Sequence, residues 1–310
     1  MAEAITPAPI GDGDAIQRPS WLGAVMQRYE MLRGYSLLMP AFACMIVGIL
    51  IPSIILIAMS FWTAAGFDFN TEFSLKNYQE AFDRPVYAAL IGRSLWISAM
   101  ATLATVILCY PMAYYVAFHV RKNKILWLIL MTLPFWTSYL LRVFAWKIIL
   151  GYDGMINATL TGIGIIDQPL EFLLYSPTAV IITLAHAWAA FAILPIYVSL
   201  EKIDRSLLEA ATDLGDGPVE RFLRVTLPLS LPGVFAAMLL IFIPTVGDYI
   251  TPALLGGPDG LMIGNFIQLQ FGRANNWPMG AALAILMMLT VTFCAAAVWI
   301  GTRAMTKRIA

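Results

Sequence analysis

The sequence has 310 residues, of which 60% are hydrophobic and only 12% are charged. Soluble domains carry roughly 45–50% apolar and about 25% charged residues, so this composition excludes a soluble enzyme, a DNA-binding protein and a disordered chain. The 19 basic and 19 acidic residues cancel, so no net charge attracts nucleic acid. The composition therefore predicts a protein that lies in the lipid bilayer.

The chain opens with a polar tail, residues 1–34, that carries charges of both signs. Because this tail lacks the short apolar core of a signal peptide, we expect it to be retained. Four apolar positions in its second half fall at helical spacing and predict an amphipathic helix on the membrane surface. These positions are Trp21, Val25, Tyr29 and Leu32. Residues 1–15 are equally compatible with a disordered tail.

Six apolar runs follow the tail, and each is longer than the roughly 20 residues that a helix needs to cross a bilayer. The runs cover residues 34–67, 94–120, 125–150, 172–200, 225–247 and 274–302. Only the third contains charged side chains, Arg142 and Lys147. Solid apolar runs, as opposed to alternating ones, exclude a β-barrel. The sequence therefore predicts an all-α membrane protein with six transmembrane helices in one domain, residues 35–310.

The distribution of basic residues predicts the orientation of these helices. The tail, the second and fourth loops and the C-terminal segment carry most of the Lys and Arg that lie outside the runs. These residues are Arg18, Arg28, Arg33, Arg121, Lys122, Lys124, Lys202, Arg205, Arg221, Arg224, Arg303, Lys307 and Arg308. Since basic loops stay in the cytoplasm, we expect both termini on the cytoplasmic side.

The fourth loop, residues 201–233, is the longest predicted cytoplasmic connection. Ser206 and Glu209 have the spacing of a capping box that begins a helix. Gly215 supplies a left-handed position that ends it. Asp216 and Pro218 are typical of the N-cap and first turn of a second helix.

Two prolines, Pro228 and Pro232, should stop this second helix before the fifth span. The pattern therefore predicts two short helices joined by a sharp turn, which together form a compact structure on the membrane surface. An ordinary pair of interfacial helices fits the same pattern.

This loop resembles the EAA motif of ABC importer permeases, whose pattern is EAA-x3-G-x9-I-x-LP. The residues that match are Glu209, Ala210, Ala211, Gly215, Leu227 and Pro228, with Val225 in place of Ile. The resemblance implies a type I ABC importer permease fold. It also implies that the loop between spans four and five is a coupling helix, which docks on an ATP-hydrolysing subunit.

Three further stretches, residues 134–150, 254–271 and 275–282, resemble spermidine/putrescine importer permeases. This resemblance implies polyamine cargo and a bacterial inner-membrane location. It also implies a second related permease as a heterodimer partner, two ATP-binding subunits and an extracytoplasmic solute-binding protein. No GxxxxGK[ST] motif occurs, so we expect no cofactor on this chain, with ATP and Mg on the partner subunits.

One acid, Asp248, lies well inside a predicted span and is the candidate contact for a cationic cargo. It follows segment 244–247, which includes Thr245 and whose Pro and Gly should interrupt the fifth helix. Tyr249 and Trp188 offer ring faces for cation–π contact with an ammonium group. Alternatively, Asp248 lies near the outer end of the span and is merely solvated or paired.

The third run carries bases and aromatic residues, which we expect near the outer interface. Arg142 and Lys147 should extend toward the interface or pair with acids of the loops. The aromatic residues of this run are typical of an interfacial belt, with a place along the pathway as the alternative for some of them. They are Phe135, Trp136, Tyr139 and Trp146. Pro111, Pro134 and Pro195 should kink their helices.

Three cysteines and two histidines complete the inventory of reactive groups. Cys44, Cys109 and Cys294 all lie inside apolar runs without a partner at metal-ligand spacing, so we expect no disulfide and no metal site. Two alternative functions remain from the residues alone. One is a self-sufficient ion-coupled carrier or channel, and the other is an ABC permease for another organic cation, an amino-acid derivative, a sugar or a metal chelate. An intramembrane enzyme ranks last, because no catalytic constellation is recognisable.

Overall fold

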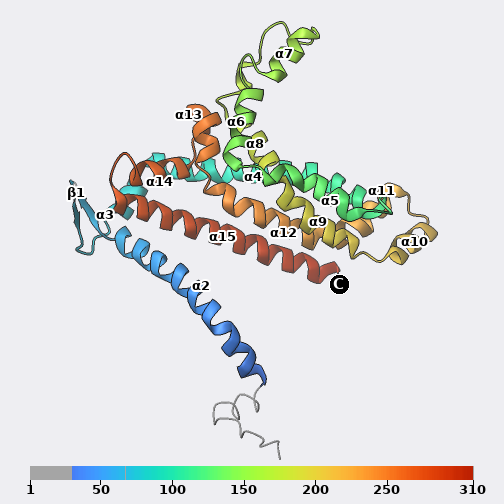
Figure 1. Ribbon diagram of the computed structural model, residues 1–310, viewed down its shortest axis with the longest axis horizontal. Coiled ribbons are helices and arrows are strands. Elements are labelled where there is room, and N and C mark those ends of the chain that lie inside the picture. Colours follow the sequence, from blue (N-terminus) through green and yellow to red (C-terminus); the bar gives the residue numbers. More distant parts are fainter. Residues whose placement is uncertain (1–29, 67, 310) are drawn as a thin grey trace, which may run out of the picture. The chain divides into compact units, whose positions relative to one another are not determined.

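The computed structural model describes residues 30–66 and 68–309, and almost every regular element among them is a helix (Figure 1). The longer helices are α2 (Glu30–Ser60), α4 (Pro85–Phe118), α5 (Lys124–Thr132), α6 (Tyr139–Ile149), α8 (Pro177–Ala187), α9 (Ala189–Glu201), α10 (Arg205–Asp213), α12 (Leu227–Val246), α14 (Ile263–Phe271) and α15 (Trp277–Ile309). The shorter ones are α3 (Lys76–Asp83), η1 (Leu133–Trp136), α7 (Met155–Gly162), η2 (Glu171–Leu173), α11 (Pro218–Arg221), η3 (Phe222–Thr226), η4 (Pro252–Gly256) and α13 (Gly257–Gly260). A two-stranded antiparallel hairpin, β1 (Thr63–Ala65) and β2 (Asp68–Asn70), is an addition to the expected all-α fold.

The chain divides into two units, Met1–Ile55 and Leu56–Ala310. The predicted surface helix around Trp21, Val25 and Tyr29 lies outside the described residues. Helix α2 begins at Glu30, four residues before the first apolar run, so the expected tail boundary at residue 34 falls inside a helix. From Leu37 to Ser60, α2 is apolar enough to cross a membrane.

Among the described residues, four helices are long and apolar enough to span a bilayer, and two bent helix pairs raise that number to six if each pair is one span. The four unbroken helices contain the first, second, fifth and sixth of the apolar runs predicted from the sequence. The third run bends by 84° between η1 and α6, next to Pro134, and the fourth bends by 51° between α8 and α9. The predicted kink at Pro134 is therefore confirmed, because the helix that contains it ends at Trp136.

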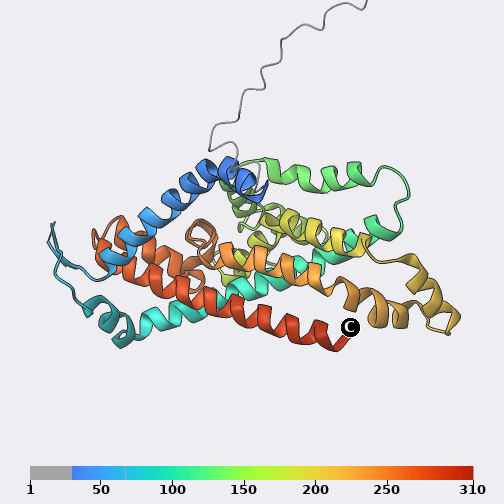
Figure 2. The same ribbon diagram turned by 90° about the horizontal axis from the view of Figure 1, so that it is seen from below.

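Within the larger unit, α9 packs chiefly against α12 and α4. Their contact is a buried apolar cluster that includes Cys109 of α4, Ile193 and Ile196 of α9, and Ala237 and Ile241 of α12. Such side chains give close interhelical packing, which holds helices together where lipid removes the usual hydrophobic drive. These three helices form the centre of the bundle (Figure 2).

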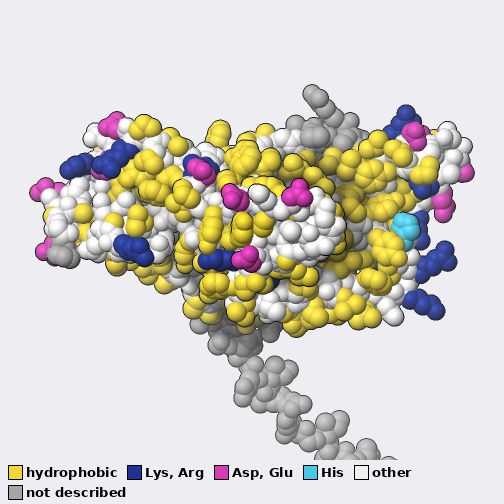
Figure 3. Space-filling view, turned by 90° about the horizontal axis from the view of Figure 1, so that it is seen from above, with side chains coloured by type: hydrophobic (Ala, Val, Ile, Leu, Met, Phe, Trp, Pro, Cys, Tyr) yellow, Lys and Arg dark blue, Asp and Glu magenta, His cyan; other side chains and the backbone are white. Residues whose placement is uncertain are grey.

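The two ends of the bundle carry different structures. Figures 1 and 2 place α10, α11 and the C-terminal end of α15 at the same end, and α3 with the hairpin at the other. Figure 3 shows hydrophobic side chains over much of the bundle and many Lys and Arg side chains gathered near its ends. This distribution fits a body that spans a membrane and meets water at both ends.

The fourth loop folds as two short helices, as predicted, but its boundaries differ from expectation. Asp204, and not Ser206, caps α10: its carboxylate accepts a hydrogen bond from the Ser206 backbone N–H. The predicted capping box of Ser206 and Glu209 is therefore wrong. Gly217 is the N-cap of α11, which corrects the prediction for Asp216. Each correction shifts a helix start by a residue or two, within the range where local signals compete.

The second helix does not stop at Pro228 or Pro232, which corrects another expectation. Helix α11 continues through the π-turn η3 into α12, so that Pro218–Val246 is one candidate span. Pro228 lies just after the π-turn, and because proline has no N–H, the backbone hydrogen bond that a continuing helix would make at this position is absent. The π-turn immediately before it widens the hydrogen-bonding step from four residues to five.

Candidate functional site

The first candidate region is the helical knob, residues 204–226, which comprises the Asp204 cap, α10, α11 and η3. Its turn closes as a Schellman motif: the Asp216 N–H donates to the Ala211 carbonyl and the Gly215 N–H to the Thr212 carbonyl, both at 3.0 Å. Gly215 has φ +92°, a left-handed conformation that strains any residue with a Cβ. The predicted role of Gly215 as the turn residue is confirmed.

Two polar contacts fix α10 against α11 and η3. Arg221 donates to the Thr212 hydroxyl at 2.9 Å, and Arg224 forms an ion pair with Asp216 at 2.7 Å. Asp216 therefore binds a side chain eight residues further along instead of capping α11. Together with the turn, these contacts join the two short helices into one body.

The knob exposes four large apolar side chains. They are Leu207, Leu214, Val219 and Leu223, with Leu214 88% exposed. Among the motif residues, Glu209 and Ala210 are exposed beside them, while Ala211 is buried and faces the body of the protein. Leu227 and Pro228 are half-buried in the first turn of α12. An apolar surface with charged neighbours, at the end of a membrane bundle, suits a protein partner.

The second candidate region lies where the fifth span breaks. Helix α12 ends at Val246, and helical structure resumes at Ile250 and continues into η4. The predicted interruption beside Asp248 is therefore confirmed. Gly264 of α14 covers the break closely, since a Cβ there would lie 2.8 Å from the Gly247 carbonyl oxygen and 2.9 Å from that of Asp248.

Asp248 bridges the break to the third span. Its Oδ1 accepts a hydrogen bond from the Ile250 backbone N–H at 2.9 Å, which caps the resumed helix. Its Oδ2 accepts one from the Tyr139 hydroxyl at 2.5 Å, and that hydroxyl also lies 2.6 Å from Thr251 Oγ1. Because a carboxylate offers about four acceptor positions, these two bonds leave room for a further donor.

Arg142, one turn after Tyr139 on α6, reaches the break in the fourth span. It donates to the carbonyl of Ala187, the last residue of α8, at 3.2 Å. Its guanidinium also lies 4.9 Å from the centre of the Phe135 ring and 5.9 Å from that of Tyr139. The expectation that Arg142 pairs with an acid is wrong among the described residues, because its guanidinium lies against a helix C-terminus and two rings instead, with its Nε buried and unpartnered. The extension of Arg142 to the outer interface stays a prediction.

We call Tyr139, Arg142, Asp248 and Thr251 the polar junction. Trp188 adjoins it at the bend between α8 and α9, with its ring centre 6.4 Å from that of Tyr139. Two of the predicted cargo residues therefore contact one tyrosine: Asp248 through the Tyr139 hydroxyl and Trp188 through its ring. The indole N–H of Trp188 is buried and has no hydrogen-bond acceptor within the part of the chain that the structure describes.

The other two predicted cargo residues lie apart from this arrangement. Thr245 is fully buried, and its hydroxyl donates to the carbonyls of Ile241 and Phe242 in its own helix. Tyr249 is exposed and lines a separate pocket of about 460 Å³ with Gly264 and other residues of α14. Neither contact links these two side chains to the Asp248 carboxylate.

The sequence reasoning missed Tyr139 and Arg142 as members of this site. It assigned Tyr139 to an interfacial belt and Arg142 to the membrane surface. The available signal was their spacing, because positions three apart on a helix share a face. Ser138 and Pro134 just before them mark the end of a bent helix, where polar side chains are often inserted.

Comparisons with known proteins agree with the motif. Residues 20–305 match the family described as binding-protein-dependent transport system inner membrane component. The spermidine/putrescine transport system permease protein PotB of Escherichia coli is 36% identical over 266 residues, which cover 86% of this chain and 96% of that protein. PotB of Haemophilus influenzae is 39% identical over 245 residues, covering 79% and 85%.

A solved structure has a similar fold. It is the crystal structure of a bacterial ABC transporter involved in the import of the acidic polysaccharide alginate. One chain of it superposes with a TM-score of 0.72 at 17% sequence identity, covering 92% of this chain and 99% of that one. At this identity, the likeness concerns the fold alone.

Proposed function

Because this chain belongs to the family of binding-protein-dependent transport system inner membrane components, we propose that it is a permease subunit of an ATP-driven polyamine importer. The chain itself is a transport component and not an enzyme. The observation that supports cationic cargo most directly is the Asp248 carboxylate, held half-buried at a helix break by the hydroxyl of Tyr139, whose ring in turn lies near that of Trp188. An ammonium group gains from both a carboxylate and aromatic faces once water is removed.

In this proposal the chain crosses the bacterial inner membrane six times, each bent helix pair being one span, with both termini in the cytoplasm. The shared end of the knob and the C-terminus in Figures 1 and 2 supports the placement of both on one side. Six spans form half of a pathway, so a second related permease completes it. Two ATP-binding subunits supply ATP and Mg, and an extracytoplasmic solute-binding protein delivers the cargo.

The helical knob is then the coupling element. Its exposed Leu207, Leu214, Val219 and Leu223 form the apolar surface that docks on an ATP-binding subunit, with Glu209 and Ala210 in the contact. ATP binding would draw two such knobs together and open the spans outward. Hydrolysis would return them inward. The tight turn at Gly215 and the ion pair between Arg224 and Asp216 support this role, because an element that transmits motion must stay rigid when it moves.

The junction is the cargo contact within the membrane. Asp248 supplies the negative charge, Tyr139 binds that carboxylate through its hydroxyl, and Trp188 next to Tyr139 supplies an aromatic ring for the cargo. Arg142 remains bound to the C-terminus of α8. The negative end of that helix partly compensates the charge of Arg142, so this charge does not act on the Asp248 carboxylate alone. Thr245 and Tyr249 are weaker members of the proposed pathway, because one is buried in its helix and the other lines a different pocket.

The decisive experiment identifies the partners and the cargo together. The chain, tagged at its C-terminus, would be extracted gently from its native membrane and weighed by native mass spectrometry. We expect one copy of this chain, a second permease and two ATP-binding subunits. The same complex in proteoliposomes, with its binding protein, should take up spermidine or putrescine only when ATP is present. A chain that purifies without any ATP-binding subunit in several mild detergents would favour the ion-coupled carrier instead.

A further inference from the structure

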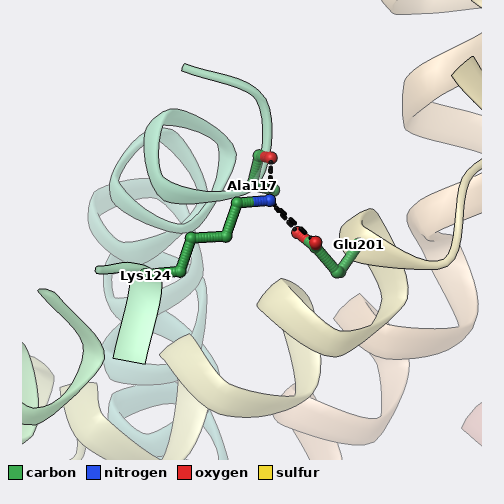
Figure 4. Close-up of polar contacts among 3 residues, drawn as sticks. All are labelled: Ala117, Lys124 and Glu201. Atoms are coloured by element: carbon green, nitrogen blue, oxygen red, sulfur yellow. Dashed lines mark hydrogen bonds and ion pairs between the residues drawn. The ribbon is translucent and has the colours of Figure 1, made fainter. Parts of the chain in front are cut away.

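The ends of three helices meet at one ammonium group (Figure 4). Lys124 Nζ lies 2.7 Å from both carboxylate oxygens of Glu201 and 2.9 Å from the carbonyl oxygen of Ala117. Ala117 is in the last turn of α4, Lys124 is the first residue of α5, and Glu201 is the last residue of α9. One side chain therefore ties the ends of the second and fourth predicted spans to the start of the third.

This contact differs from an ordinary surface ion pair. The Lys124 side chain is only 20% exposed, and it also binds one of the carbonyls that a helix end leaves without an intrahelical partner. Glu201 occupies a helix C-terminus, where the helix dipole disfavours an acid. Lys124 offsets this unfavourable interaction, while the Glu201 side chain itself is 41% exposed to water. The dipole of α9 therefore adds to the hydrogen bonds in favouring the pairing of Glu201 with Lys124.

The pair lies directly between the knob and the membrane helices. Glu201 is three residues before Asp204, the cap of α10, and the intervening Ile203 is buried in the core of the bundle. The connection from α9 to the knob is therefore short and anchored. Any displacement of α10 must pull on the end of α9, and through Glu201 on Lys124.

On its other side, Lys124 begins the path to the polar junction. Helix α5 runs from Lys124 to Thr132, η1 follows, and α6 then starts at Tyr139, which binds Asp248. The third predicted span thus has the ion pair at its start and the proposed cargo contact directly after its bend. Rigid helical elements joined at bistable contacts are the means by which coupling crosses such distances.

We propose that the Lys124–Glu201 pair transmits displacement of the knob to the third span, so that both are positioning residues for coupling ATP hydrolysis to transport. The proposal rests on the proposed docking of the knob on an ATP-binding subunit. It assigns no contact with cargo or nucleotide to either residue. Without the pair, the knob still docks and the partner still hydrolyses ATP, but less of the motion reaches α5 and α6.

The test is the number of polyamine molecules taken up per ATP hydrolysed, measured with the complete complex in proteoliposomes. Lys124→Met should lower this ratio by about fivefold, the lower end of ordinary coupling between sites. Retention of the ATP-binding subunit and ATP hydrolysis itself should stay close to wild type. Lys124→Arg keeps the charge and should restore most of the ratio.

Glu201→Gln provides the second arm, since it removes the charge pair while Lys124 can keep its bond to the Ala117 carbonyl. We expect it to lower the ratio like Lys124→Met, and the double variant to be no worse than either single one. Should Met at position 124 prevent assembly, this arm supplies the comparison. Arg84→Gln is the matched control, because it breaks an ion pair of 3.0 Å with Glu80 on α3, away from the knob, and should leave the ratio unchanged.

Two outcomes would overturn the proposal. One is a wild-type ratio in both Lys124→Met and Glu201→Gln. The other is a parallel loss of ATP hydrolysis, subunit retention and thermal stability, which would make the pair a structural support and nothing more. Failure of the proposed function is a separate result: the wild-type complex would then take up no polyamine, or would purify without an ATP-binding subunit.

Discussion

The knob and the polar junction are built in opposite ways. The hydrogen bonds and the ion pair that shape the knob join residues close together in the sequence: the Asp204 carboxylate accepts from the Ser206 N–H, the Asp216 N–H donates to the Ala211 carbonyl, and Arg224 pairs with Asp216 eight residues away. Among the aromatic contacts of the described residues, only those of Phe222 with the Tyr110 and Tyr114 rings of α4 join the knob to a distant part of the sequence. The junction joins Tyr139 to Asp248 across 109 positions. The first region is determined by local chemistry and the second by how bent helices are brought together.

This difference decides what each region can do. A structure held by contacts between neighbouring residues keeps its shape when it moves, which an element that docks on a partner requires. A junction whose members come from separate spans changes when those spans shift, because each break is held by a side chain from α6. Tyr139 binds the break in the fifth span and Arg142 the break in the fourth. The contrast predicts that substitutions in the knob act on partners and those in the junction act on cargo.

The largest expected effect comes from removing the charge of Asp248 while its side chain can still accept a hydrogen bond. Asp248→Asn retains an oxygen that accepts from Tyr139 or Ile250 but loses the negative charge. Since hydrogen bonds to charged groups contribute about 1.5–3 kcal/mol, we expect uptake of a cationic polyamine to fall about 10- to 150-fold. Uptake would be measured at equal membrane abundance and with the ATP-binding subunits still bound.

Asp259→Asn is the control, because Asp259 is an exposed acid on α13, outside the junction. Its uptake should match wild type. Full uptake by Asp248→Asn would remove Asp248 from the pathway and leave it as the cap of the helix that resumes at Ile250.

The next effect concerns the knob. Gly215→Val places a β-branched residue at φ +92°, where a left-handed backbone costs an L-residue about 1–2 kcal/mol. The turn between α10 and α11 should open, and retention of the ATP-binding subunit in co-purification should fall about 5- to 30-fold. Binding of cargo by the junction should be unaffected in any complex that survives.

A matched substitution lies two residues away in the same loop. Gly217 has no left-handed backbone, and a Cβ there would meet only the side-chain carboxylate of Glu220, which can move aside. Gly217→Ala should therefore retain the ATP-binding subunit. If both glycine variants lost it equally, the loop would be sensitive to any substitution and the left-handed turn would not be the cause.

The contrast also explains what the sequence could predict. The break at Asp248, the turn at Gly215 and the two short helices all follow from neighbouring residues, and the structure agrees. The failures fall into two kinds. The starts of α10 and α11 were displaced, because Asp204 competes with Ser206 as a cap, and Arg224 draws Asp216 away from capping.

The second kind of failure involves tertiary structure. Arg142 was expected to pair with an acid of the loops because an isolated base in a span has no other partner, yet the bend at Trp188 frees the Ala187 carbonyl to accept from it. Tyr139 was expected in an aromatic belt for the same reason. A pattern along one helix does not reveal which carbonyls and carboxylates another helix presents to it. Such residues can be found from sequence only once the bends are known.

A smaller effect is expected from removing the Tyr139 hydroxyl in the polar junction. Tyr139→Phe keeps the ring beside Trp188 but leaves Asp248 and Thr251 without the hydroxyl between them. Interhelical hydrogen bonds in membranes average about 0.6 kcal/mol and reach about 1.7. We expect the loss to lie near the upper value because a carboxylate is involved. The readout is the thermal unfolding midpoint of the purified complex.

Tyr110→Phe is the comparison for this measurement. It removes another interhelical hydroxyl contact, 2.7 Å from Ser230, but Ser230 keeps its bond to the Leu227 carbonyl. Its cost should lie near or below the average. Equal shifts in both variants would mean that the junction stabilises the bundle no more than a neutral contact does.

The smallest effect is the pH dependence of the cap on α10. The Ser206 backbone N–H that binds the Asp204 carboxylate lowers the pKa of Asp204 below its ordinary value. Since the folded state favours the charged form, the cap stabilises α10 fully above the pKa of the unfolded chain. That stabilisation is lost as the pH falls through the lower, folded pKa. Amide exchange within α10, corrected for intrinsic rates, should therefore quicken only under acidic conditions.

Asp204→Asn makes this prediction specific. Asn caps helices about as well as Asp, so α10 should stay protected at neutral pH, while the corrected exchange should no longer respond to acid. Asp204→Ala should lose protection at every pH. Since the cap acts within the knob, neither variant should alter the exchange of amides around Asp248. A change there would mean that the two regions are coupled through α9 even at rest, and the Lys124–Glu201 pair would be the first place to look for the connection.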